Sequence, residues 1–273
     1  MKRDSDPQFI DLHCHLLPGI DDGPRNWETT LTMARLALAE GIHTVVVTPH
    51  QLGRYERNTP DRILELTAEA QQRLRAAGLP LTVLPGADVR VQEDLPSLVR
   101  NRQVLSLGDR RAHLLMELPH DQVLPLANLI YQLHCLGIAC ILSHPERNEQ
   151  LQENPELLRP WVQQGCLLQV TSASIIGHFG SVAKRFSRWL FRENMVHLVA
   201  TDAHDATHRP PLIRQAFEKA RRWVGVSRAE KIFFENPQAV IRGKAVDVPL
   251  PASSSPAGLT SWWKTALAPL GIA

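Results

Sequence analysis

The sequence predicts an α/β protein whose parallel strands form a distorted TIM-like barrel. Short apolar, β-branched runs alternate with longer stretches of helical periodicity along almost the whole chain. Seven such runs, most of them followed by one helix-length stretch, favour a barrel over an open sheet. At 273 residues the chain is also long enough to bury a substantial core in one large domain.

The predicted strands and helices follow one another with short connections. The strands are expected at residues 9–13, 44–48, 81–85, 113–117, 140–143, 167–170 and 197–200. The helices are expected at 27–40, 61–77, 123–136, 155–164, 182–193 and 211–223, with a last helix from about 227 through Phe234 and a turn at Asn236-Pro237. Local signals support several helix ends. Asn26 and Thr59-Pro60 suit helix starts, and glycines suit helix ends at Gly41, Gly78, Gly137 and Gly165.

Two regions depart from this alternation. Residues 89–109 carry several charges and no helix-length periodicity, which predicts an inserted hairpin or lid. From Pro249 onward the composition shifts to Pro, Ser and Ala, as in linkers. We therefore expect a domain over residues 1–248 and a flexible tail over 249–273. The segment 259–273 could alternatively dock on a partner or a membrane surface.

Composition excludes several classes of function. The net charge is +2 and the basic residues are dispersed, so nucleic-acid binding is not expected. The first eight residues are polar, unlike a signal peptide. The sequence contains no run of about 18 apolar residues, so membrane insertion is not expected. The four cysteines lie in or beside apolar segments without Cys-x-x-Cys spacing, which predicts reduced thiols in a cytoplasmic protein.

Polar donors follow nearly every predicted strand. The first strand runs into His13 and His15, which share a face because alternate side chains of a strand point the same way. Such a pair is weak evidence alone, since most surface histidine pairs bind nothing. Carboxyl ends of parallel strands converge in α/β folds, however. The ends of the predicted strands and the segments after them together supply nine nitrogen or oxygen donors: His13, His15, Asp22, His50, Asp88, Glu117, His144, Asp202 and His204.

Nine converging donors exceed the four to six ligands of a single ion and therefore suit two or three divalent ions. The sequence alone does not decide whether Asp21 or Asp22 is the ligand. Asp11 faces the same side as His13, where it could orient a ligand or simply accept a hydrogen bond. Structural roles are expected for the other histidines, which do not follow strands in this pattern: His43, His113, His120, His134, His178, His197 and His208.

Cysteine chemistry does not fit the sequence. A cysteine-dependent phosphatase needs an arginine six residues after its cysteine, to complete the loop that holds phosphate. The residues at those positions are Ile20, Ile141, Glu146 and Ser172. Cys14, between two predicted ligands, is therefore expected to be a packed and inert side chain. Phosphate-binding Gly-x-x-x-x-Gly-Lys loops and Gly-x-Ser-x-Gly elbows do not occur either.

These motifs resemble those of the PHP (polymerase and histidinol phosphatase) superfamily, and most closely the PHP-type protein-tyrosine phosphatases of bacterial capsule and exopolysaccharide systems. The resemblance spans residues 9 to 243. It rests on Asp11-Leu-His-Cys-His15, Asp21-Asp-Gly-Pro24, Thr48-Pro-His50, Gly86-Ala-Asp88, Glu117, Ser143-His-Pro-Glu-Arg147, Asp202-Ala-His204 and Arg209-Pro-Pro211.

The resemblance implies a distorted (β/α)7 barrel with three divalent ions, often manganese, with iron, zinc, magnesium or cobalt as alternatives. It implies one ion between His13, His15, Asp88 and Asp202, a second between Asp88, Glu117 and His144, and a third between Asp22, His50 and His204. Asp88 departs from the family, which usually has a glutamate as the bridging carboxylate. The aspartate side chain is shorter than glutamate by one methylene group, so the number of ions bound can differ from that of the family.

The implied activity is hydrolysis of phosphotyrosine, with the tyrosine-rich tail of a bacterial tyrosine autokinase as substrate. Metal-bound hydroxide would attack phosphorus directly, without a phosphoenzyme. Arg147 and Arg209 are expected to hold phosphate oxygens, and Asp202 or His204 to shuttle a proton. The alternatives are a small-molecule phosphatase acting on a substrate such as histidinol phosphate and, less favoured, a nuclease or an inactive binding module.

Overall fold

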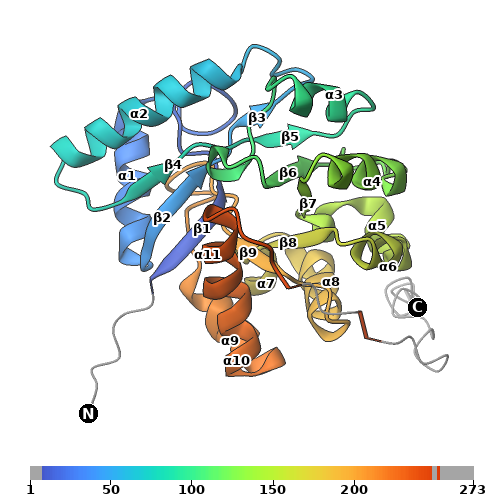
Figure 1. Cartoon of the computed structure of the whole chain (residues 1–273). Helices are drawn as coiled ribbons and strands as arrows, with labels where there is room; N and C mark the ends of the chain where they lie inside the picture. The colour runs from blue at the N-terminus through green and yellow to red at the C-terminus, as the bar shows by residue number, and fades with distance from the viewer. Residues whose placement is uncertain (1–7, 248–250, 253–273) are drawn as a thin grey trace, which may run out of the picture.

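A computed structural model describes residues 8–247 and 251–252 and shows parallel strands surrounded by helices (Figure 1). The strands are β1 Phe9–Cys14, β2 Ile42–Val47, β3 His50–Gln51, β4 Thr82–Leu84, β5 Asp88–Arg90, β6 His113–Glu117, β7 Ala139–Ser143, β8 Leu167–Thr171 and β9 Leu198–Ala200. The helices are α1 Trp27–Ala39, α2 Pro60–Ala76, α3 Leu95–Arg100, α4 Ala127–Cys135, α5 Glu149–Glu153, α6 Leu158–Gln163, α7 Ser172–Ile176, α8 Gly180–Arg192, α9 Arg214–Val224, α10 Val226–Glu230 and α11 Asn236–Ile241.

The strands form two parallel sheets, in the orders β1-β2-β4 and β3-β5-β6-β7-β8-β9. The chain passes from β2 to β3 through Thr48-Pro49, and from β4 to β5 through residues 85–87. Proline cannot donate to a strand ladder, so Pro49 and Pro85 interrupt pairing where the chain changes sheet. All seven predicted strands are present, and two of them continue into the second sheet. The prediction of a distorted TIM-like α/β fold is thus confirmed.

The first and last strands meet at a seam rather than in a continuous ladder. Within residues 8–247, β1 contacts the segment after β9 through a single parallel bridge between Cys14 and Ala203. Two backbone bonds flank this bridge, from His15 N to Ala203 O at 2.8 Å and from Asp202 N to His13 O at 2.7 Å. Asp11 reinforces the seam, because its carboxylate accepts hydrogen bonds from the backbone N and the hydroxyl of Thr201.

Apolar side chains fill both faces of the strands, as expected for parallel sheets. The interior cluster contains one or two residues from each of six strands, together with Leu107 and Val240. The strand residues are Ile10, Leu12, Val46, Leu115, Ile141, Leu167 and Leu198. A larger cluster packs the outer helices against the strands. Gly86 lies where the sheets approach, since a Cβ there would be 2.8 Å from Val46 Cγ1. This packing leaves the opposite end of the strands for polar groups.

The helix predictions hold within a few residues. Asn26 Oδ1 accepts from Thr29 N at 2.9 Å, and Thr59 caps α2 with Pro60 in its first turn. The predicted hairpin or lid at 89–109 is wrong, because β5 pairs in parallel with β3 and β6 and α3 follows it. The predicted turn at Asn236-Pro237 is instead the start of α11, where a proline is tolerated.

Two expectations concern the chain ends and membranes. Apart from residues 251–252, the predicted tail 249–273 lies outside the described residues. The helices in the described part of the chain include none long and apolar enough to cross a membrane.

Candidate metal centre

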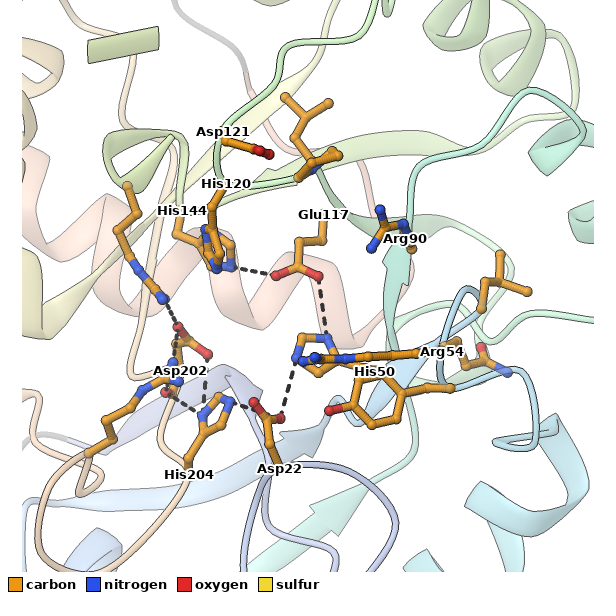
Figure 2. A pocket seen from close by; sticks show the side chains of 17 residues that line it. Asp22, His50, Arg54, Arg90, Glu117, His120, Asp121, His144, Asp202 and His204 are labelled. Carbon is orange, nitrogen blue, oxygen red and sulfur yellow. Dashed lines mark hydrogen bonds and ion pairs between the residues drawn. The ribbon is translucent and has the colours of Figure 1, made fainter. Parts of the chain in front are cut away.

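The structure brings all nine predicted ligands together. Most lie at or just after the carboxyl end of a strand, whereas His50 and Asp88 begin the short strands β3 and β5, which follow β2 and β4. Figure 2 shows six of them around one cavity, where dashed lines join Glu117 to His50 and His144, and Asp22 to His50 and His204. The other three, His13, His15 and Asp88, lie deeper, with no side-chain exposure. His144 and Asp202 follow β7 and β9 with left-handed backbone angles, φ +31° and +52°. Such strain persists only where the surroundings hold it.

The donor atoms form four overlapping groups, in each of which they lie within 4.8 Å of one another. The groups are His15-Asp22-His50-His204, His13-His15-Asp88, His13-His144-Asp202 and His50-Asp88-Glu117. Asp88 belongs to two groups, as a bridging carboxylate would. His144 falls with His13 and Asp202 rather than with Asp88, although its Nε2 is 3.5 Å from Glu117 Oε1. How the donors divide among ions therefore stays a prediction.

His13 and His15 point their Nε2 atoms at each other, 3.2 Å apart. Each ring is held from behind through its Nδ1, which is 2.8 Å from Gln169 Oε1 in His13 and 2.7 Å from Asp21 Oδ2 in His15. If both Nδ1 atoms donate to these oxygens, both Nε2 lone pairs converge on one point. Fixing the tautomer in this way is how ligating histidines are held in metal sites.

The structure separates the roles of the two neighbouring acids. Asp21 orients ligands, because it also accepts from His50 N at 3.1 Å and from Gly23 N at 2.9 Å. Asp22 reaches the cluster itself, with Oδ1 3.5 Å from the Nε2 atoms of both His50 and His204. The geometry thus favours Asp22 as the donor to a metal.

Charge is tightly balanced in this cluster. Burial lowers the pKa of His50 to about 4. Burial also disfavours the charged form of His15, but the carboxylates of Asp21 and Asp202 outweigh it and raise its pKa to about 10. Burial would raise the pKa of Asp202, yet His13, His15 and Arg209 hold it well below its usual range. Asp202 therefore stays ionised and is a poor proton donor.

Asp88 is the clearest sign that a cation belongs here. Its side chain is fully buried, and neither carboxylate oxygen has a hydrogen-bond partner. His13 Nε2 and His50 Nδ1 lie 3.6 and 3.5 Å from Oδ2, but burial lowers the pKa of both rings, so neither supplies a paired positive charge. Burial, together with the nearby Glu117, raises its pKa well above the usual range. An unpaired buried carboxylate is costly unless it is neutralised or coordinates a metal. The donors present therefore fit divalent ions.

Arg147 and Arg209 both bind the carboxylate of Asp202. Arg147 Nη1 contacts Asp202 Oδ2, and Arg209 Nη2 lies 2.6 Å from the same oxygen. Both guanidinium groups also lie over the ring of Phe179, at 4.4 and 5.7 Å from its centroid. Each keeps further N–H groups unused by Asp202, and both line the cavity.

The cavity holds about 360 Å³ and includes residues that the strand-end pattern missed: Arg54, Tyr55, Arg90 and His120. His120, for which a structural role is expected, lines the cavity, and its ring lies 5.6 Å from that of His144. Extending each strand end by three residues would have found it after Glu117. Arg54 and Tyr55 come from a turn that no motif marked. By contrast, His113 and His197 are buried away from the cavity, as expected.

Cys14 is packed in the core, as its position in the strand predicted. It is buried, and burial raises the pKa of its thiol well above the usual value. All four cysteines are free, and Cys135 alone among them is exposed. The cavity lining contains none of them, which leaves no thiolate to attack a substrate there.

The fold and this cluster together define a class of protein. It is a parallel α/β protein with a candidate multinuclear metal centre at the carboxyl ends of its strands, next to arginines suited to binding anions. Comparisons with known proteins narrow this class further.

Residues 9–242 match the family model described as capsular polysaccharide synthesis, CpsB/CapC. The tyrosine-protein phosphatase YwqE of Bacillus subtilis is 36% identical over 239 residues, covering 87% of this chain and 93% of YwqE. The tyrosine-protein phosphatase CpsB of Streptococcus pneumoniae is 24% identical over 243 residues, covering 87% of this chain and 100% of CpsB. The chain belongs to the CpsB/CapC family, which confirms the resemblance found in its motifs.

Solved structures agree with this assignment. A chain from the crystal structures of YwqE from Bacillus subtilis and CpsB from Streptococcus pneumoniae, described as unique metal-dependent tyrosine phosphatases, matches with a TM-score of 0.86 and 34% identity, covering 90% of this chain and 99% of that one. Dihydropyrimidinase from Brevibacillus agri matches with a TM-score of 0.54 at 10% identity, covering 91% of this chain and 74% of that one. The second similarity shows a shared fold alone.

Proposed function

We propose that this protein is a metal-dependent protein-tyrosine phosphatase that acts on a bacterial tyrosine autokinase in capsule or exopolysaccharide synthesis. One observation carries the proposal: nine nitrogen and oxygen donors converge around a buried, unpartnered Asp88, in a member of a family whose relatives are named tyrosine-protein phosphatases. The family membership supplies the substrate class, and the cluster supplies the chemistry.

We propose that three divalent ions, most favourably manganese, are held by His13, His15, Asp22, His50, Asp88, Glu117, His144, Asp202 and His204. Iron, zinc, magnesium or cobalt would also suit imidazole and carboxylate donors. When bound, such ions lower the pKa of water toward neutrality and neutralise charge on phosphate oxygens. The orienting contacts of Asp21 and Gln169 support this ligand set.

The chain's own residues position the phosphate. Arg147 and Arg209 line the cavity with N–H groups that Asp202 does not use, and these groups suit phosphate oxygens. Tyrosinate is a good leaving group, because its conjugate acid has a pKa near 10. Asp202 and His204 both stay candidates for carrying the proton: their surroundings keep Asp202 ionised, and burial together with His15 lowers the pKa of His204.

The test is phosphate release from a phosphotyrosine peptide with added manganese. We expect His13→Ala and His144→Ala to lose metal and activity together, whereas the matched control His134→Ala, on α4, keeps both. Activity should survive alkylation of thiols and disappear with a chelator. Retained activity in both ligand variants, or loss on alkylation, would reject the site. A higher kcat/KM on histidinol phosphate than on the peptide would favour a small-molecule phosphatase.

We also place this reaction in the cytoplasm. All four cysteines are free and three are buried, which suits a reducing compartment. Expression in an oxidising and a reducing compartment, followed by comparison of soluble yield and activity, tests this placement.

A further inference from the structure

A second pair of arginines lies on the other side of the cavity from Arg147 and Arg209. Figure 2 shows Arg54 and Arg90 beyond His50 and Glu117, whereas the first pair is bound to Asp202 at the opposite side. Both Arg54 and Arg90 line the cavity and are exposed to solvent. The cavity therefore presents positive charge on two sides of the candidate metal centre.

Strand pairing fixes the position of Arg90. His50 of β3 lies opposite Asp88 of β5, so two predicted ligands face each other across this ladder. Arg90 comes two residues after Asp88 on the same strand and therefore on the same face. Two residues of a strand span about 6–7 Å. Arg90 thus lies beyond the buried Asp88 toward the mouth of the cavity, level with Glu117, its register partner on β6.

A tight turn brings Arg54 to the same place. An isolated antiparallel bridge joins Leu52 to Tyr55, and Leu52 and Gly53 both have left-handed backbone angles, φ +73° and +57°. Arg90 packs on this turn so closely that a Cβ at Gly53 would lie 2.8 Å from its Cδ. The two arginines are therefore held side by side by their backbones.

Neither arginine is paired with a carboxylate in the described part of the chain. The guanidinium of Arg54 lies 4.9 Å from the Tyr55 ring centroid, and that ring stacks on His50 with centroids 5.2 Å apart. Across residues 8–247, no carboxylate forms an ion pair with Arg54 or Arg90, whereas Arg147 and Arg209 share Asp202. Tyr55 supports Arg54 over the cavity, and the hydrogen bond between the two side chains leaves further N–H groups of Arg54 for a ligand.

We propose that Arg54 and Arg90 bind an anionic group next to the phosphotyrosine of the substrate. This inference rests on the proposed phosphatase function and specifies its substrates: phosphotyrosine segments with a neighbouring carboxylate side chain or a second phosphotyrosine. The phosphate being hydrolysed has to lie among the metal donors. Arg147 and Arg209 approach these donors from the Asp202 side, whereas Arg90 lies beside Glu117 at the opposite edge of the donor cluster. The second pair therefore meets a flanking group rather than that phosphate.

The experiment compares kcat/KM on one phosphotyrosine peptide in four versions, whose flanking residue is glutamate, a second phosphotyrosine, glutamine or lysine. We expect the two anionic peptides to exceed the glutamine peptide by roughly tenfold, a range typical of charge-assisted hydrogen bonds. The preference should shrink as salt is raised. A preference for both anionic peptides supports a general anion site, and a preference for the doubly phosphorylated peptide alone identifies phosphate as its ligand.

The double variant Arg54→Gln, Arg90→Gln should bring the ratio of anionic to neutral peptide close to one. The control Arg57→Gln changes an exposed arginine near the same turn that does not line the cavity, and it should keep the ratio. Absence of any preference in the unmodified enzyme would overturn the proposal. So would a double variant that loses activity equally on all four peptides. Failure of the metal-loaded enzyme on every peptide would instead refute the proposed phosphatase function.

Discussion

At Asp88 a carboxylate is buried with no hydrogen-bond donor for either oxygen, and Glu117 adds a second negative group nearby. In a metal-free protein this arrangement costs stability, because the carboxyl group is neither solvated nor hydrogen-bonded. With cations bound, the same carboxylate becomes a ligand. A single residue therefore has opposite effects on stability in the two states.

Replacing Asp88 with asparagine tests that reversal. We expect Asp88→Asn to raise the Tm of the metal-free protein by about 2–4 °C, the change that about 1 kcal/mol produces in a domain of this size. The same variant should lose most of the stabilisation that manganese gives the unmodified protein. Thermal melts with and without manganese measure both effects. An undiminished manganese shift in the variant would show that Asp88 is not a ligand.

His113 predicts how acid affects stability. It is buried with no partner for either ring nitrogen, and burial lowers its pKa from 6.5 to about 4. Below pH 6.5 the unfolded chain binds a proton that the folded chain refuses, so stability falls as the pH drops toward 4. The loss can reach about 3 kcal/mol.

The variant His113→Leu should flatten the dependence of unfolding free energy on pH between about 6.5 and 4, without lowering stability at pH 7. Urea unfolding at a series of pH values measures this slope. The exposed His208→Asn serves as control and should leave the slope unchanged. An equally steep slope in His113→Leu would mean that other groups cause the acid sensitivity.

Among the elements, β1 and β9 matter most to the site, because together with their following segments they carry His13, His15, Asp202 and His204. Thr201 joins them through two hydrogen bonds to Asp11. Without the hydroxyl, Asp11 Oδ2 would lose this donor in a buried position. Removing one partner of a buried hydrogen bond costs about 1–3 kcal/mol.

We therefore expect Thr201→Val to lower the free energy of unfolding by about that amount and to weaken metal binding, because β9 would shift relative to β1. Thr82→Val, a matched change at an exposed position of β4, should do neither. Denaturant unfolding and metal titration give the two readouts. If Thr201→Val is destabilised but binds metal with unaltered affinity, the contact between Thr201 and Asp11 does not position the metal ligands.

Over the whole molecule, the donors come from β1 and the segment after it, from β3, β5 and β6, and from the segments after β7 and β9. Bound ions would thus link strands around most of the barrel. We expect a chelator to lower the Tm of the entire domain in one cooperative transition, and manganese to restore it in proportion to the logarithm of its concentration. Calorimetry with metal titration checks this. A Tm that changes with neither the chelator nor manganese would indicate that metal ions do not contribute to the stability of the domain.

The sequence predicts most of this fold because each long strand carries a local apolar signal, as in His113–Glu117, whose limits match the structure. It misses β3 and β5, where His50 and Asp88 replace the apolar pattern with site residues. Donors after strands can be predicted for the same topological reason. Arg54, Tyr55 and His120 cannot, since their approach depends on a turn and on the path of the chain beyond a strand end.

The seam between β1 and β9 also dictates when the site can exist during synthesis. Asp11 and Thr201 are 190 residues apart, and the donors extend from residue 13 to residue 204. A ribosome adding about 5–20 residues per second needs roughly 10–40 s to cover that interval. During this time the nascent chain exposes His13 and His15 without their partners. We therefore expect the complete set of metal donors to form late, after the last strand has left the ribosome.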